Sequence, residues 1–168
     1  LLSGAHAMDT HFKTAPLGSN LPVIMGLLRI WQRTFLGHTA YGLMPYDQRL
    51  SRFPAWAQQL EMESNGKSVD RFGNALSTPA GLLIWGGVGT SNQHSFFQWL
   101  HQGRDIVPID LLVARKSAIR PDDPTWQASH KTLLINAISQ AEALAIGASN
   151  SDEPHRHFPG NRPSVLIS

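Results

Sequence analysis

Near the middle of the chain a short apolar run, a glycine-rich turn and the start of a helix follow one another. The apolar run is Leu82–Trp85, and residues 86–89 read Gly-Gly-Val-Gly. Thr90 or Ser91 can cap a helix that the pattern extends over residues 92–102. A strand, a tight turn and a helix in this order are the repeating unit of sheets with parallel strands.

The same alternation continues on both sides of this unit. Apolar spacing, together with capping residues, proline and glycine, predicts helices over residues 20–35, 54–64 and 122–148. Apolar runs predict strands over residues 39–44 and 105–114, and a further strand at the C-terminal end, from Val165. We therefore expect an α/β fold in which a parallel sheet is flanked by helices on both faces.

Composition predicts whether two further segments are buried or exposed. The helix over residues 20–35 is apolar nearly all round, which is typical of a buried helix. Residues 149–163 are rich in Pro, Asn and His, and we expect them to form an exposed loop.

The overall composition excludes several classes of protein. The chain carries 14 Lys+Arg against 12 Asp+Glu with no basic run, so binding to nucleic acid is not expected. It has no cysteine, which removes disulfides, thiolate metal sites and cysteine nucleophiles. The longest apolar stretch, Leu21–Leu28, is too short to cross a bilayer, which needs about 20 residues. We expect a soluble, cytoplasmic protein that does not associate with membranes.

The surface and the ends of the chain favour contact with other protein. Charged residues make up 15% of the chain, against about 25% in an average protein. The chain starts with Leu1-Leu2 and ends with Val165-Leu166-Ile167-Ser168, both apolar, whereas domains seldom begin and end inside apolar elements. We therefore expect a piece of a longer polypeptide, part of whose surface is covered.

A pair of polar residues near the end of the helix over residues 54–64 is a candidate for acid-base chemistry. Gln59 and Glu63 are four residues apart, so they share one helical face. In the last turn the negative end of the helix dipole raises the proton affinity of a carboxylate if the site is dry, which suits a general base. The alternative is a solvated surface glutamate beside Glu61.

His94 is the second candidate. It falls in the first turn of the helix after the glycine-rich turn, where the positive helix end favours a neutral imidazole that can exchange a proton. The alternative is a partly buried histidine that bonds to a backbone carbonyl. The glycine-rich turn lacks both the GK[ST] ending of a P-loop and the third glycine of GxGxxG, so a nucleotide-binding module, a third possible function, depends on a weak signal.

A metal site is not expected. His94 and His101 lie on one helical face, but seven helical residues rise about 10 Å, which is too far for one ion. His155 and His157 stand in a polar loop, and no HExxH string is present.

Several strings resemble the phosphoglucose isomerase family. They are MESNGK at residues 62–67, WGGVGTSNQHSFFQWLHQG at residues 85–103 and FPGNRPS at residues 158–164. Other strings of the family occur in the right order, so the resemblance covers nearly the whole chain. It implies a sugar-isomerase (SIS) fold that is incomplete at both ends, with residues 1–168 forming part of the second of two SIS domains.

The resemblance also implies a reaction. The family interconverts glucose 6-phosphate and fructose 6-phosphate by moving a proton between C2 and C1 through an enediolate, without cofactor or metal. Glu63 matches the base, and His94, 31 residues later, matches the histidine that helps to open the sugar ring. Gln59 matches a glutamine that contacts the substrate. The family forms a homodimer in which the neighbouring subunit brings the histidine to the site.

Some family features have no counterpart in the chain. Many members read WGEPGTNGQH where residues 85–94 read WGGVGTSNQH. The family's Ser/Thr-rich phosphate-binding loop, the arginine of its GGR string and its C-terminal lysine are also missing. We therefore expect the chain to be inactive by itself. The alternative is a non-catalytic SIS module that binds a sugar phosphate.

Overall fold

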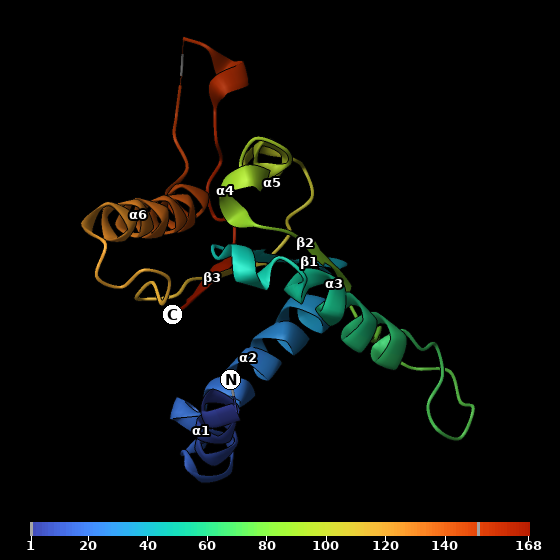
Figure 1. Ribbon diagram of the computed structural model, residues 1–168. Coiled ribbons are helices and arrows are strands. Elements are labelled where there is room, and N and C mark those ends of the chain that lie inside the picture. Colours follow the sequence, from blue (N-terminus) through green and yellow to red (C-terminus); the bar gives the residue numbers. More distant parts are fainter. Residues whose placement is uncertain (1, 151) are drawn as a thin grey trace. The chain divides into compact units, whose positions relative to one another are not determined.

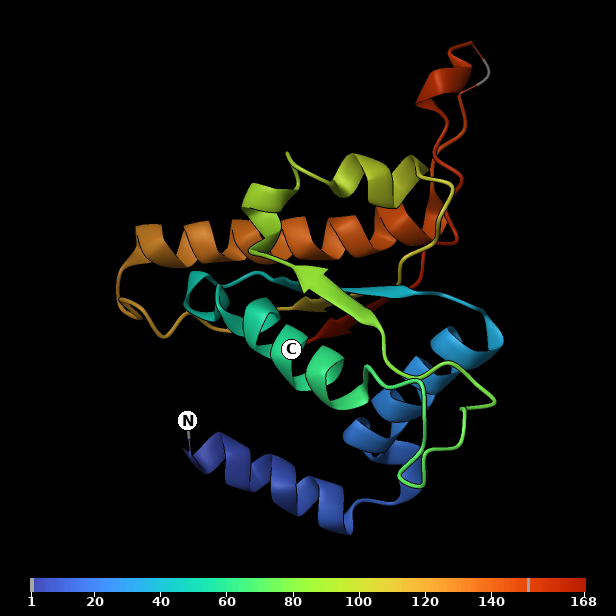
Figure 2. The ribbon, with the colours of Figure 1, turned by 90° about the vertical axis from the view of Figure 1, so that its right-hand side faces the viewer.

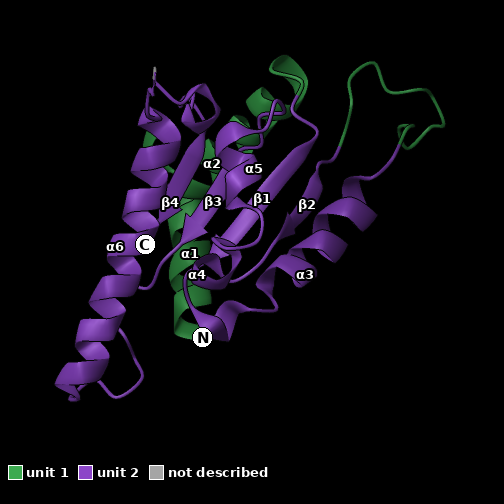
Figure 3. Cartoon of the chain, turned by 90° about the horizontal axis from the view of Figure 1, so that it is seen from above, with its two compact units in different colours: residues 1–37, 68–80 green, residues 38–67, 81–168 purple. Residues whose placement is uncertain are grey.

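The computed structural model of the chain describes residues 2–150 and 152–168. The chain divides into two compact units, which Figure 3 colours separately. The first combines Leu1–Gly37 with Ser68–Ala80, and the second combines His38–Lys67 with Gly81–Ser168.

The first unit contains two helices joined through Asn20. Helix α1 spans Leu2–Thr14, and after a 3-10 turn at Leu17–Ser19 helix α2 spans Leu21–Ile30 and continues as a π-turn, η2, over Trp31–Phe35. The Asn20 side chain accepts a hydrogen bond from Val23 N, as the predicted cap does, and donates to Phe12 O at 2.8 Å. A single buried amide thus fixes both helix ends.

The prediction that this helix is buried is wrong for the described chain. No residue of α2 is buried, and Leu27 and Ile30 are 60% and 55% exposed. The unit offers too little chain to cover a helix that is apolar on every side. Its other part, Ser68–Ala80, is a loop with one antiparallel bridge between Val69 and Ala75, in agreement with its turn-rich sequence.

The second unit is built on a four-stranded sheet (Figure 1), which confirms the α/β prediction. Its strands are β1 (Ala40–Pro45), β2 (Leu83–Gly86), β3 (Ile109–Leu112) and β4 (Ser164–Ile167). They are all parallel and lie in the order β2-β1-β3-β4. The strand predicted over residues 105–114 is shorter because Pro108, which has no N–H group to donate, stands directly before Ile109.

Helices cover the two faces of this sheet (Figure 2). One face carries α3 (Phe53–Gln58), which continues as the π-turn η4 (Gln59–Glu63). The other carries α4 (Gly89–Asn92), α5 (Phe97–Gln102) and α6 (Pro124–Ile146).

The side chains of β1 alternate between these two faces. Tyr41 and Leu43 are packed with Ala57 of α3, whereas Met44 and the following Tyr46 are packed with residues of α5 and α6. Each face of the sheet therefore has its own apolar core, as expected for a parallel sheet between helices.

The helix predicted over residues 92–102 is divided in two. Helix α4 begins at Gly89, ahead of the predicted caps Thr90 and Ser91, and residues 93–96 form turns before α5. The break lets the Phe96 ring meet the Trp85 ring edge-on at 4.6 Å while Phe97 is buried in the core. Aromatic packing against β2 overrides helix continuity at this point.

Two residues of the glycine-rich turn have no room for a side chain. Gly86 has φ +143°, and a Cβ atom on it would lie 2.0 Å from the Leu43 carbonyl oxygen. A Cβ atom on Gly89 would lie 2.1 Å from the Tyr46 ring. These glycines therefore allow the turn to pack closely against the β1 backbone and the Tyr46 ring.

Helix α6 and the segment after it complete the unit. The Asp123 side chain caps α6, and Gly147, with φ +71°, ends it. Within residues 149–163 a 3-10 turn, η5, spans Pro154–Arg156, and most of the described side chains are exposed, although Gly160 and Arg162 are buried. No helix in the described part of the chain has the length and hydropathy needed to span a membrane.

Candidate active site

The first candidate pair lies on the π-turn η4. Gln59 and Glu63 are its first and last residues, and both are exposed. A π-turn makes i→i+5 hydrogen bonds, so residues four apart still project from nearly the same side. Turns of this kind occur frequently at functional sites. The structure thus brings Gln59 and Glu63 together, as their spacing predicts.

The residues after Glu63 close the helix. The Lys67 ammonium group donates to the Glu63 carbonyl oxygen at 2.5 Å, and its distance to the Ser64 carbonyl oxygen is 3.4 Å. The Asn65 amide donates to the Glu61 carboxylate at 3.0 Å. A lysine at a helix C-terminus satisfies the last carbonyl groups and complements the dipole. Sequence reasoning did not assign this role to Lys67, although a lysine four residues after the last helical glutamate is a signal for it.

The two glutamates of this turn have different surroundings. Glu61 is bound by Asn65, whereas no residue in the described part of the chain donates a hydrogen bond to the Glu63 carboxylate. Glu63 is also exposed, so the described residues do not supply the dry surroundings that the general-base hypothesis requires.

His94 lies between α4 and α5 and is exposed. Its imidazole has no hydrogen-bond partner among residues 2–150 and 152–168, which disagrees with the alternative of a histidine bonded to a backbone carbonyl. The neighbouring Gln93 fixes the turn, because its amide donates to the Tyr46 hydroxyl at 2.8 Å.

The structure places Glu63 near the amino end of strand β2 and His94 after its carboxyl end. Asn65, two residues after Glu63, lies against Gly81, which leads into the amino end of β2. His94 follows the carboxyl end of the same strand, and Gln93 beside it is bonded to Tyr46 at the carboxyl end of β1. The five residue steps from Gly81 to Gly86 span about 16 Å. Within one chain the backbones that carry Glu63 and His94 are therefore separated by about the length of β2.

Two cavities of the second unit lie away from the predicted pair on η4. One of about 290 Å³ lies at the carboxyl ends of β1 and β3, and one of about 380 Å³ between α5 and α6 is lined by Gln93 among others. Gln59, Glu63 and His94 line neither of them. Among the described residues no group of three His, Asp or Glu side chains is close enough to hold a metal ion.

Comparison with known proteins gives consistent results. The profile of the phosphoglucose isomerase family matches residues 1–168. Glucose-6-phosphate isomerases of Brucella ovis and Brucella canis are each 45% identical over 184 aligned residues, which cover 99% of this chain and 33% of the relative. The chain thus spans about a third of the length of these curated relatives.

Solved structures agree with this result. A crystal structure of a glucose-6-phosphate isomerase from Chlamydia trachomatis superposes with a TM-score of 0.85 at 39% identity, covering 98% of this chain and 32% of that one. A hypothetical protein from Thermus thermophilus gives a TM-score of 0.61 at 27% identity, covering 84% of this chain and 35% of that one.

Proposed function

The chain belongs to the phosphoglucose isomerase family, and on this ground we propose that it supplies catalytic residues to an isomerase of glucose 6-phosphate and fructose 6-phosphate. The observation that carries the proposal is the π-turn η4, which presents Gln59 and Glu63 together while Lys67 and Asn65 close the helix behind them. Its parallel sheet between helices is the SIS-type fold that the family resemblance predicts.

Glu63 acts as the base in the proposed reaction. Its carboxylate takes the proton from C2 of the open-chain aldose. The released electron pair forms a C1–C2 double bond while the π pair of the C1 carbonyl moves to O1, which gives an enediolate. The same carboxyl group then returns the proton to C1, while the O2 proton passes to O1, which gives the ketose. An unengaged carboxylate suits this role, since a general base must be free to accept a proton.

His94 and Gln59 serve the steps around this transfer. A neutral imidazole can give its N–H proton to the ring oxygen while its other nitrogen takes the proton of the C1 hydroxyl, so that the bond between C1 and the ring oxygen breaks and the sugar ring opens. Gln59 lies on the same side of η4 as Glu63, where its amide can hold a substrate hydroxyl.

We propose that the His94 of a site comes from a second copy of the chain. Glu63 and His94 of one chain are separated by about the length of β2, whereas C1, C2 and the ring oxygen belong to one sugar. In a symmetric dimer the two faces of one interface are identical, so each copy can lend its histidine to the other.

The test uses the chain in two forms. Residues 1–168 are assayed alone and in place of the corresponding third of the Brucella ovis isomerase, with conversion of fructose 6-phosphate as the readout. We expect no turnover from the chain alone, because the family's phosphate-binding loop has no counterpart in it, and turnover from the grafted enzyme. In the graft, Glu63→Gln should lower turnover by at least about 100-fold.

The control is Glu61→Gln in the same graft. This change removes the other carboxylate of the turn, which is bound by Asn65, and should leave turnover within a few-fold. Calorimetry with fructose 6-phosphate should show that the Glu63→Gln graft still binds the sugar. Full turnover after Glu63→Gln would refute the assignment. Sugar-phosphate binding without turnover in the unmodified graft would favour a non-catalytic SIS module.

A further inference from the structure

The cavity of about 290 Å³ lies where ligands of parallel sheets usually bind. It begins at Tyr46 directly after β1, and its opposite wall is the first part of α6 with the loop that follows β3. In the order β2-β1-β3-β4, the chain continues from β1 to its outer neighbour β2 and from β3 to its outer neighbour β4. The direction of connection therefore reverses between β1 and β3. Open α/β sheets bind ligands in the crevice at such a reversal, outside the carboxyl ends of the strands.

The walls of this cavity are mainly apolar. Tyr46 forms its base, and Ile119, Trp126 and Leu133 line its sides. Ile119 and Trp126 remain about two-fifths exposed, so the chain does not cover them itself. The volume is at the lower end of the range of about 300–1,000 Å³ for ligand pockets, which suits a ligand with a single ring.

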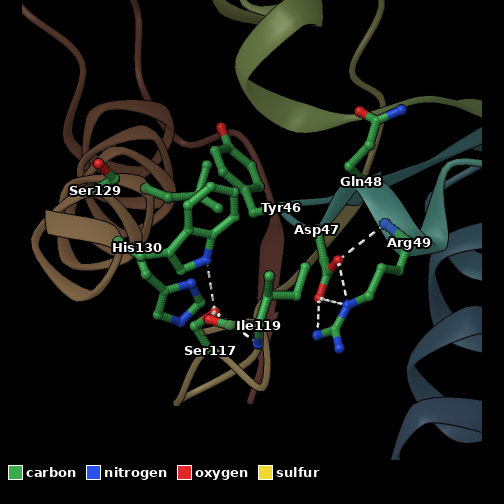
Figure 4. A pocket seen from close by; sticks show the side chains of 10 residues that line it. Tyr46, Asp47, Gln48, Arg49, Ser117, Ile119, Ser129 and His130 are labelled. Carbon is green, nitrogen blue, oxygen red and sulfur yellow. Dashed lines mark hydrogen bonds and ion pairs between the residues drawn. The ribbon is translucent and has the colours of Figure 1, made fainter. Parts of the chain in front are cut away.

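Several polar groups of the cavity are already hydrogen-bonded to other residues. Figure 4 shows Asp47 bonded to Arg49: the guanidinium donates from Nε at 3.0 Å and from Nη2 at 2.6 Å, and Arg49 N donates to the same carboxylate. The Ser117 hydroxyl accepts from the Trp126 indole at 3.1 Å. His130 Nε2 lies 2.8 Å from the Ala114 carbonyl oxygen, which can only accept, so this nitrogen carries a proton.

The Arg49 guanidinium retains hydrogen-bond donors although it is paired with Asp47. The Arg49 guanidinium is about half exposed and keeps its Nη1 hydrogens. The Tyr46 hydroxyl accepts from Gln93 and retains its own proton. Arg120 lies over the Trp126 ring, 5.5 Å from its centroid, and its guanidinium is 3.9 Å from the Asp123 carboxylate, so its charge is largely offset. A ligand that matches these groups brings acceptors and negative charge.

We propose that this cavity binds a small organic anion whose body is one apolar ring and whose anionic group is held by Arg49. The ring lies between the apolar walls, where its burial provides most of the affinity. A guanidinium recognises a carboxylate in a planar, two-pronged geometry, so an aromatic carboxylate is the ligand class that fits. This inference does not depend on the proposed isomerase function.

The test is a titration of the 168-residue chain with benzoate, followed in ¹H–¹⁵N spectra through the indole N–H signals. The Trp126 signal is assigned with Trp126→Phe. We expect it to shift in a saturable manner, while the signal of Trp56, which lies on α3, stays in place. Benzyl alcohol and benzamidine have the same ring without the negative charge and should bind at least about tenfold more weakly. Equal binding of all three compounds, or no saturable shift, would overturn the proposal.

Two substitutions at the Asp47–Arg49 ion pair should change the affinity for benzoate in opposite directions. Asp47→Asn frees the guanidinium while the new amide can still accept from Arg49 N, and we expect benzoate to bind about tenfold more tightly. Arg49→Gln leaves the Asp47 carboxylate unpaired, and binding should weaken by about tenfold or more. Arg104→Gln, an exposed arginine outside the cavity, is the control and should change nothing.

A cavity-filling variant tests whether benzoate binds in this cavity. Leu133→Trp places an indole in the space between the walls and should abolish benzoate binding. Folding of each variant is checked by the dispersion of the amide spectrum. Unchanged benzoate affinity in folded Leu133→Trp, or changes of the same sign in the two ion-pair variants, would refute this site.

Discussion

Glu61 and Glu63 are chemically identical residues of one turn, and their neighbours make them different. The Asn65 amide binds Glu61, and Lys67 binds the backbone carbonyl of Glu63, which leaves the Glu63 carboxylate unengaged within the described chain. Helical spacing predicted that Gln59 and Glu63 share a side, but spacing alone could not separate Glu63 from Glu61. The string MESNGK at residues 62–67 separates them, because the resemblance to the family assigns the role of the base to Glu63 only.

Asp47 allows a prediction about pH. Its hydrogen bonds from the Arg49 guanidinium, which outweigh the desolvation of the carboxyl group, hold the pKa of Asp47 below its ordinary value of 3.8. Because the pKa is lower in the folded state, the pair adds stability above about pH 4, and this stability is lost as pH falls through the folded-state pKa. A carboxyl ¹³C titration should show the low pKa, and Arg49→Gln should raise it. A pKa of Asp47 that Arg49→Gln does not move would contradict this account.

Gly86 allows a prediction about backbone strain. Gly86→Ala should lower the free energy of unfolding by about 3 kcal/mol, because the residue has φ +143° and its Cβ atom would meet the Leu43 carbonyl. Urea unfolding followed by circular dichroism measures the change. Gly18→Ala is the control, since its Cβ atom meets nothing within 4 Å and should change stability by less than about 0.5 kcal/mol. Equal stability of the two variants would refute the steric argument.

At the scale of elements, the N-terminal cap of α6 allows a prediction about stability. The Asp123 carboxylate accepts from Thr125 N at 3.0 Å and from Trp126 N at 3.2 Å. Asp123→Ala should cost about 1 kcal/mol in urea unfolding, and Asp123→Asn should restore most of it because an amide oxygen can also cap. Asp122→Ala, the neighbouring acidic residue that does not cap, is the matched control. A loss shared equally by Asp122→Ala would show that charge, and not capping, is responsible.

The elements show which features local sequence could predict. All four strands, α6 and the helix that ends at Glu63 followed from apolar spacing, caps and turns, because those signals act within a few residues. The break between α4 and α5 could not be predicted from local sequence, since it depends on the contact between the Phe96 ring and the Trp85 ring of β2. Burial of Asp110 inside β3 was also not predicted: its partner, the Tyr41 hydroxyl at 2.7 Å, is 69 residues away. Contacts between distant segments leave no local pattern.

At the scale of the whole molecule, sequence separation could not say where the candidate residues lie. The 31 residues from Glu63 to His94 include one strand, β2, so the two residues lie near opposite ends of that strand. The low share of charged residues, 15%, and the exposed apolar side chains of α2 agree with our expectation that further protein covers part of the chain. The proposed site, divided between two copies, would account for this separation and can be tested directly.

Mixing two inactive variants tests the divided site. In the graft described above, Glu63→Gln and His94→Ala should each abolish turnover alone. If the histidine comes from the second copy, a mixed dimer has one site in which both changes meet and one site in which neither occurs. Random mixing makes about half of the dimers mixed, so about a quarter of the unmodified activity should return after the variants are unfolded and refolded together. If each copy used its own His94, every site would carry one of the two changes and no activity would return.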